Sequence, residues 1–175
     1  MEDILTSQEG RKPKSLLGLD YGAKTVGVAA SDALGLTAQG LEIIRRKSEK
    51  KLRQTLARID ELARERGAEA IVLGFPRTLR GGISERTART LQFRQMIMKR
   101  TSLPVVLWDE RLTTVAADRA MNETETLDHK EYVDEIAAML ILQGYLDCVN
   151  SGADVPETDA DGLLAKYQEE HPDFQ

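Results

Sequence analysis

Acidic side chains occur at three places where the surrounding sequence has the character of a buried core. Asp20 ends a short apolar run, and the pair Asp109-Glu110 ends another. Asp134 lies in the first turn of a helix pattern that continues with an uncharged, apolar stretch from Ile136 to Leu142. Each acid alone has a structural explanation, because Asp suits turns and acids stabilise the first turn of a helix. Together they are harder to explain. Converging carboxylates repel one another, and a buried charged one is costly unless a cation neutralises it.

Hard divalent cations are the ions that such oxygen ligands would bind. The chain has one cysteine, Cys148, and two histidines, His129 and His171, so a thiolate zinc site is excluded and a histidine-rich site has little material. Mg²⁺ and Mn²⁺ instead take carboxylate oxygens. Two such ions about 4 Å apart can activate water and stabilise the leaving oxygen in phosphodiester hydrolysis. The acidic positions therefore indicate a two-metal site, provided that the fold brings them together.

Changes in the hydrophobic period indicate the elements that would position these acids. Short apolar runs predict strands, and an i, i+3, i+4 stripe predicts helices. The expected elements are strands at about 15–20, 25–30 and 36–44, a helix at 48–66, a strand at 70–74, a helix at 84–100, a strand at 104–108, a short helix at 113–121 and a helix through 133–144. The first three strands form an antiparallel meander, and the helices between later strands require parallel crossovers. This order predicts an α/β fold with a mixed sheet and a site beyond the carboxyl ends of its strands.

Length and composition indicate one globular domain. The chain has 175 residues, 41% of them hydrophobic and 30% charged. We expect a flexible N-terminal arm at 1–14, one folded domain at 15–149 and an acidic, poorly ordered tail at 150–175. No apolar stretch is long enough to span a membrane, and the N-terminus lacks the pattern of a signal peptide. These features predict a cytoplasmic protein without a membrane partner.

The distribution of charge is more informative than the net charge of −5. Residues 20–100 hold 17 basic and nine acidic residues, a net charge of +8, whereas residues 151–175 hold one lysine and seven acids, a net charge of −6. Solvated helix faces would explain many of these charges singly. Such a split nevertheless often accompanies nucleic-acid binding, and here the acidic tail conceals a basic first half.

Four blocks of the sequence resemble the YqgF/RuvX family of RNase H-like nucleases. The blocks are LLGLDYGAKTVGVAASD, IVLGFP, DERLTT and VDEIAAMLILQGYLD, in the order of the family and within residues 15–148. The resemblance implies an RNase H-like fold, with a five-stranded mixed sheet flanked by helices. It also implies metal-dependent cleavage of nucleic acid, with Mg²⁺ or Mn²⁺ as the cofactor and two ions as the expected number. The family is associated with maturation of the 5′ end of pre-16S rRNA, and it has also been described as a Holliday junction resolvase.

The family's acidic positions map onto Asp20, Glu110 and Asp134, which the resemblance implies as catalytic and metal-binding residues. Glu110 is chosen over Asp109 because the DER motif carries its acid at the middle position. Adjacent side chains on a strand also point to opposite faces, so both should not reach one site. Whether Asp109 assists Glu110 stays open.

Basic residues near these acids are candidates for binding the nucleic-acid backbone. Solvated side chains are the alternative for each of them, and an ion pair with Asp109 is a further alternative for one. The candidate substrate-binding residues are Lys24, Arg77, Arg80, Arg111 and Lys130. The loop after IVLGFP departs from the family, because Arg77 to Gly82 replaces its Asn and Met-Asp-Gly, which affects substrate detail rather than the acids.

Alternatives remain for the activity and the partner. The first expectation is a hydrolase of phosphodiester bonds acting on structured RNA, with pre-ribosomal particles as partners. Branched DNA at a Holliday junction is the alternative substrate. A non-catalytic RNase H-like module that binds nucleic acid is the alternative class, although all three acids are present. An actin-like kinase is disfavoured by length, since that class needs two such domains, and the chain has no Walker-type phosphate loop.

Overall fold

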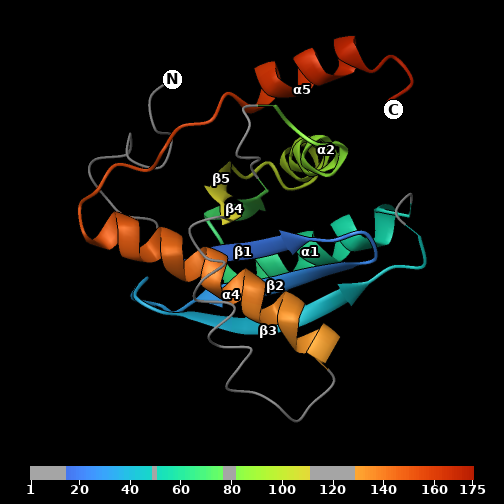
Figure 1. Cartoon of the computed structure of the whole chain (residues 1–175). Helices are drawn as coiled ribbons and strands as arrows, with labels where there is room; N and C mark the ends of the chain where they lie inside the picture. The colour runs from blue at the N-terminus through green and yellow to red at the C-terminus, as the bar shows by residue number, and fades with distance from the viewer. Residues whose placement is uncertain (1–14, 49–50, 77–81, 111–128) are drawn as a thin grey trace.

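A five-stranded mixed sheet organises the chain (Figure 1). The computed structural model describes residues 15–48, 51–76, 82–110 and 129–175. Its elements are β1 (Leu16–Tyr21), β2 (Thr25–Ser31), β3 (Ala38–Arg45), α1 (Arg53–Arg66), β4 (Ala70–Phe75), α2 (Glu85–Thr101), β5 (Val105–Asp109), α4 (His129–Asn150) and α5 (Ala160–Glu170). The predicted arm at 1–14 and the predicted short helix at 113–121 lie outside the described residues.

The strand order β3-β2-β1-β4-β5 combines a meander with two parallel crossovers. β1 pairs antiparallel with β2, and β2 with β3. On the other side of β1, β4 and then β5 join in parallel. The central strand β1 and its neighbours β4 and β5 therefore end at the same edge of the sheet, as the sequence predicted.

Helix α4 covers one face of this sheet, and glycines let it approach closely (Figure 1). A Cβ atom on Gly18 of β1 would lie 2.6 Å from Cβ of Leu142, well inside van der Waals contact. Gly27 of β2 lies directly beneath the backbone of Asp134, with a virtual Cβ 2.6 Å from the carbonyl carbon. The sheet thus sets the position of the helix that carries the third candidate acid.

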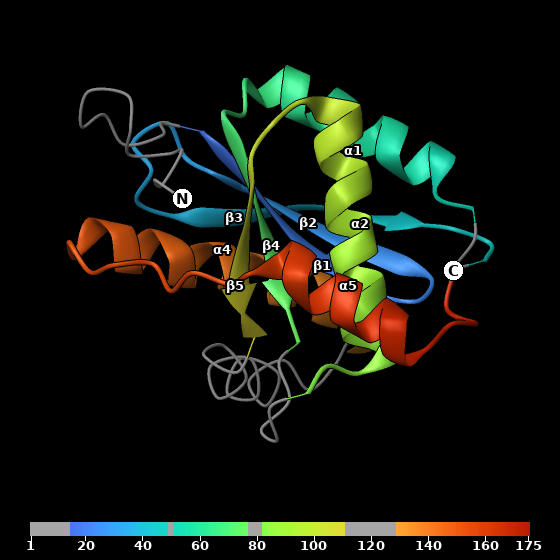
Figure 2. The same cartoon turned by 90° about the horizontal axis from the view of Figure 1, so that it is seen from above.

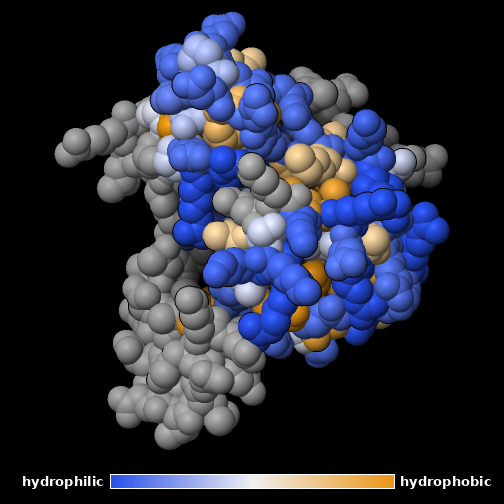
Figure 3. Space-filling view, turned by 90° about the vertical axis from the view of Figure 1, so that its right-hand side faces the viewer, coloured by the Kyte–Doolittle hydropathy of each residue, from blue (hydrophilic) through white to orange (hydrophobic). Residues whose placement is uncertain are grey.

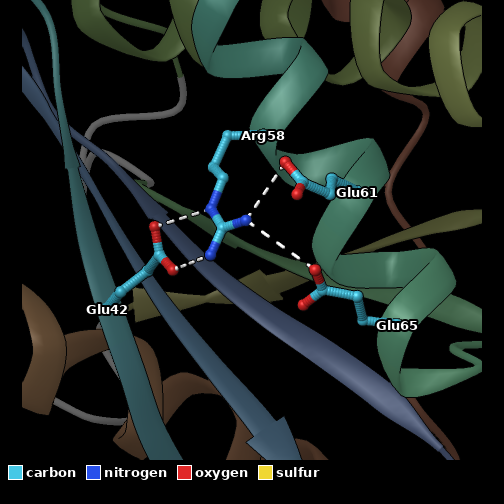
Figure 4. A network of polar contacts seen from close by, with 4 residues as sticks. All are labelled: Glu42, Arg58, Glu61 and Glu65. Atoms are coloured by element: carbon cyan, nitrogen blue, oxygen red, sulfur yellow. Dashed lines mark hydrogen bonds and ion pairs between the residues drawn. The ribbon is translucent and has the colours of Figure 1, made fainter.

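Helices α1 and α2 cover the opposite face (Figure 2). α1 ends at Gly67, which has a φ of 59°, and α2 begins at Ser84, whose hydroxyl accepts a hydrogen bond from the amide of Thr87. Arg58 of α1 binds Glu42 of β3 through two hydrogen bonds of 2.6 and 3.1 Å (Figure 4). This bidentate pair fastens α1 to the meander.

The C-terminal segment differs from the prediction of a poorly ordered tail. Asp159 caps α5 by accepting a hydrogen bond from the amide of Gly162, and the helix lies against α2 (Figure 2). Ala160, Leu164 and Tyr167 form its buried stripe and join the core on that side of the sheet. Their i, i+4, i+7 spacing is that of an amphipathic helix, and the polar residues between them masked it in the sequence. None of the described helices is long and apolar enough to cross a bilayer.

Candidate active site

Asp20 lies near the end of the central strand, on the sheet face that α4 covers. Alternation along β1 places Leu19 and Tyr21 in the core beneath α1 and α2, so Asp20 points to the other face with Gly18. Its neighbour across β2 is Gly27, which has no side chain to occupy the space beside it. The carboxyl group of Asp20 is therefore enclosed by the fold, but no side chain from Gly27 occupies the space next to it.

Glu110 reaches the same face from the end of β5. Trp108 packs with the residues under α4, whereas Leu107 packs with the opposite core, so the alternation places Glu110 with Trp108. The carboxylate lies over Gly74 of β4, where a Cβ would be 2.9 Å from Oε1. Asp20 and Glu110 share a side-chain hydrogen bond. Of the Asp109-Glu110 pair, the structure thus brings Glu110 to Asp20.

Asp134 completes the group from the first turns of α4. Its backbone carbonyl lies over Gly27, the residue paired with Asp20 across the strands. Its carboxylate Oδ2 accepts a hydrogen bond of 2.5 Å from the hydroxyl of Thr25, at the start of β2. The charge of Asp134 also acts on Asp20. All three predicted acids therefore lie at one place, beyond the end of the central strand.

The electrostatics of the group are those of carboxylates crowded in a buried place. Burial, followed by the charges of Glu110 and Asp134, raises the pKa of Asp20 from 3.8 to about 8. Burial also raises the pKa of Glu110, but the charge of Arg86 and the hydrogen bond from Asp20 oppose this rise, because both favour the charged form. The direction of these effects makes Asp20 the protonated donor and Glu110 the acceptor. A proton thus neutralises part of the group.

A divalent cation fits these residues, because it would supply the positive charge that the shared proton supplies here. Among the described residues, no three acids, histidines or cysteines already form a closed metal-binding cluster. In this structure the Asp20 and Glu110 carboxyl groups share a hydrogen bond, and the Asp134 carboxylate accepts one from Thr25. Binding a metal would require Asp20 to lose its proton.

A buried arginine, Arg46, stabilises the turn between β1 and β2. Arg46 donates a hydrogen bond from Nη2 to the carbonyl of Gly22, and its guanidinium lies 4.8 Å from the ring centroid of Tyr21. Its backbone amide binds the carbonyl of Lys24 at 2.9 Å. Lys24 itself is exposed at the tip of this turn, close in sequence to Asp20. A fixed turn therefore presents one of the predicted phosphate-binding residues.

Arg86 is a residue of this site that sequence reasoning missed. It lies in the first turn of α2, and its positive charge favours the ionised forms of both Asp20 and Glu110. The start of α2 is fastened to the end of β4, because the hydroxyl of Thr87 donates to the carbonyl of Pro76 at 2.6 Å. The available signal was its place just after a loop at the carboxyl end of a strand, but the sequence did not show that its charge reaches the acids.

The other predicted substrate-binding residues are not tested by the described structure. Arg77, Arg80 and Arg111 lie outside the described residues, and Lys130 lies in α4 with its side chain outside them. Their roles stay predictions. The backbone does place Lys130 one helical turn before Asp134, on the element that covers the site.

The chain matches known proteins over most of its length. The model of the RuvX family, described as a Holliday junction resolvase, matches residues 14–148. The chain belongs to the RuvX family. A relative from Agathobacter rectalis, named as a pre-16S rRNA nuclease, is 57% identical over 138 residues, which cover 78% of this chain and 96% of the relative. One from Lachnospira eligens, with the same name, is 46% identical over 75% of this chain and 96% of its own.

A solved structure extends the RuvX comparison to the fold. Thermus thermophilus RuvC in complex with a Holliday junction substrate superposes with a TM-score of 0.57 at 15% identity, covering 82% of this chain and 99% of that one. This likeness concerns the fold. It confirms the prediction of an RNase H-like α/β fold, and membership of the RuvX family confirms the prediction of a nuclease, a hydrolase of phosphodiester bonds.

Proposed function

We propose that this RuvX chain is a metal-dependent nuclease that processes the 5′ end of pre-16S rRNA. The observation that carries the proposal is the convergence of Asp20, Glu110 and Asp134 at the carboxyl ends of neighbouring strands, where burial and mutual repulsion call for a cation. The names of the relatives from Agathobacter rectalis and Lachnospira eligens support the RNA substrate. Pre-ribosomal particles are the corresponding proposed partners.

The three acids would hold two divalent ions, either Mg²⁺ or Mn²⁺. When bound, such ions supply activation of water and stabilisation of the charge that develops on the leaving oxygen. Asp20 contributes by giving up its proton on metal binding, and Asp134 would be oriented by the hydroxyl of Thr25. Arg86, in the first turn of α2, favours the charged forms that this role requires.

Basic side chains around the acids would hold the substrate. We assign contacts with backbone phosphates to residues on the turn after β1, the loop after β4, the segment after β5 and the start of α4. These residues are Lys24, Arg77, Arg80, Arg111 and Lys130. Such contacts position a nucleic acid without reading its sequence, so structural features of the RNA would have to supply selectivity.

Cleavage of a four-way DNA junction is the second candidate function. The description of the family as a Holliday junction resolvase favours it. Resolution of a two-fold junction would be expected to use a two-fold dimer of the enzyme. A non-catalytic RNase H-like module is the remaining class, and the presence of all three acids in one place counts against it.

The deciding experiment offers the purified chain two substrates in Mn²⁺. One is an RNA that carries the 5′-extended end of pre-16S rRNA, and the other is a four-way DNA junction. We expect cleavage of the RNA at a discrete position, no cleavage by Asp20→Asn, and little action on the junction. Preferred cleavage of the junction would replace the first candidate with the second, and binding of RNA without cleavage by the unaltered chain would favour the non-catalytic module.

Depletion in the source organism extends this test to the cell. Accumulation of 5′-extended 16S rRNA is expected on depletion, with rescue by the unaltered gene and not by its Asp20→Asn variant. Normal 5′ ends together with a recombination defect would support junction resolution instead. The cytoplasmic location expected from the sequence stays a prediction that tagged protein in the same strain can test.

A further inference from the structure

A C-terminal strap, residues 151–175, lies beyond the part of the chain that the RuvX family shares. The family model ends at residue 148, and the Agathobacter rectalis relative is matched over 96% of its own length by 78% of this chain. The strap still has a defined structure, because α5 packs along α2 on the outside of the molecule (Figures 1 and 2). What it covers on α2 therefore indicates what it adds to the shared fold.

The strap is anchored by apolar and aromatic contacts along α5 and just after its C-terminal end. Leu164 and Tyr167 are 2% and 8% exposed and belong to the core cluster beneath α1 and α2. Beyond the helix, the ring of Phe174 meets the ring of Tyr167 edge-on, with centroids 5.1 Å apart. His171 stacks on the same tyrosine at 4.0 Å. These contacts hold the acidic segment against α2.

The anchored strap occupies two arginines of α2. The carboxylate of Asp161 accepts hydrogen bonds of 3.3 Å from both Arg94 and Gln95. The Arg94 side chain is only 17% exposed. The guanidinium of Arg89 lies 5.2 Å from the ring centroid of Phe174, over its face. Both arginines thus face the strap.

These arginines follow Arg86 along the helix that begins beside the acidic centre. Without the strap, a polyanion that extended from the centre along α2 would meet these arginines. With the strap in place, it would meet residues 151–175, whose seven acids and one lysine give a net charge of −6. All seven acids are exposed. In the space-filling view, hydrophilic side chains dominate the upper part of the molecule, where α5 lies (Figure 3).

We infer that the C-terminal strap is a specificity element that withholds the α2 arginines from nucleic acid. It does so by covering Arg94, by stacking Phe174 against Arg89, which also pairs with Glu85 of its own helix, and by repelling phosphates from that side of the centre. Nucleic acids that lack the structural features recognised by the rest of the site then gain little binding affinity from non-specific phosphate contacts. The enzyme therefore discriminates more strongly between its substrate and other nucleic acids. This inference rests on the proposed function, because it presumes that the centre acts on nucleic acid.

The first experiment changes the charge of the strap without disturbing its anchors. The variant Asp161→Asn/Glu169→Gln/Glu170→Gln removes three exposed acids. Its matched control, Glu61→Gln/Glu65→Gln/Glu69→Gln, removes three exposed acids on and just after α1, two of which pair with Arg58 (Figure 4). Binding of a noncognate DNA duplex is measured at several salt concentrations. We expect the strap variant to bind several-fold more tightly than the control at low salt, with a steeper salt dependence.

The second experiment detaches the strap while keeping its charges. Leu164→Ser/Tyr167→Ser removes the buried anchors, and fluorescence of Trp108, which packs under α4 on the other face of the sheet, reports whether the domain stays folded. Detachment should steepen the slope of log Kd against log salt by about one for each arginine that reaches a phosphate. Adding Arg94→Gln to the detached variant should reverse part of this gain.

The outcomes separate the inference from the proposed function. If the unaltered chain cleaves the RNA but strap and control variants bind the duplex with equal affinity and slope, the inference is wrong and the proposed function stands. If neither the unaltered chain nor any variant binds or cleaves nucleic acid, both are overturned. Tighter duplex binding by both strap variants, with RNA cleavage retained and the ratio of cognate to noncognate affinity lowered, supports the inference.

Discussion

A carboxyl group buried beside two others keeps its proton unless a cation takes the place of that proton. Asp20 is in this position, with a pKa raised from 3.8 to about 8, first by burial and then by Glu110 and Asp134. At neutral pH the metal-free protein would therefore hold Asp20 mostly protonated. Metal binding should release this proton, so the apparent metal affinity should rise with pH up to about pH 8.

The same raised pKa predicts how stability depends on pH in metal-free protein. Between the unfolded value of 3.8 and the folded value of about 8, the folded state binds the proton and the unfolded state does not, so stability falls as pH rises across this window. Asp20→Asn should remove this fall and stabilise the protein at pH 8 by about 2 kcal/mol, a value reduced for partial exposure. Thermal unfolding in EDTA from pH 5 to pH 9 measures it.

Asp32, in the turn between β2 and β3, offers a control of the opposite sign. Hydrogen bonds from the backbone amides of Leu36 and Thr37 hold the pKa of Asp32 below its usual value. Asp32→Asn should therefore lower stability at neutral pH. Equal behaviour of the two Asn variants, or an unchanged pH profile in Asp20→Asn, would contradict the assignment of the raised pKa to Asp20.

Arg86 makes a second prediction at the residue scale. Because its charge favours ionised Asp20 and Glu110, Arg86→Gln should raise both pKa values and move the acid limb of the pH–rate profile to higher pH. The loss of activity at pH 7 should be no more than about tenfold, since Arg86 is exposed and water screens its charge. Arg86→Lys should restore the profile, and a limb that stays in place in the Gln variant would exclude this role.

At the scale of elements, glycines determine where the third acid lies. Gly27→Ala would place a methyl group 2.6 Å from the carbonyl carbon of Asp134, so the start of α4 would have to move away from β2. We expect a loss of about 1–3 kcal/mol in stability and a loss of activity of up to about a hundredfold from misplacement of the acid. Chemical denaturation and single-turnover cleavage measure the two effects. Gly82→Ala, with no described atom within 4 Å of the new Cβ, should leave stability unchanged.

The sequence predicted the strands and the mixed sheet, because these follow from local apolar runs. The choice of Glu110 as the partner of Asp20 came from the resemblance to the family, since alternation along a strand says only that Asp109 and Glu110 should not both face one site. The sequence did not predict α5 as an ordered element. The stripe of Ala160, Leu164 and Tyr167 is short, and its partner α2 lies far away in the chain. Arg86 was missed for a related reason. A charge acts through space, and only the placement of α2 shows which carboxylates it faces.

At the scale of the whole molecule, the net charge of −5 is the sum of separate parts with opposite signs. Residues 20–100 carry +8, and the strap that carries −6 lies against one of the basic helices within that range. The sequence alone indicated that the basic and acidic charges are separated along the chain. Only the structure shows that the acidic strap contacts a basic helix. The effect of the strap should therefore be measurable as a change in the salt dependence of nucleic-acid binding.

We propose that Glu110, rather than its neighbour Asp109, joins Asp20 in a metal-dependent centre that cleaves nucleic acid. Single-turnover cleavage of the 5′-extended pre-16S rRNA in saturating Mn²⁺ tests it most directly, with the variants Glu110→Gln and Asp109→Asn compared at equal protein stability. We predict that Glu110→Gln lowers the rate by at least about a hundredfold, while Asp109→Asn retains it within about tenfold. The reverse order, with Asp109→Asn inactive and Glu110→Gln active, would contradict the site described here.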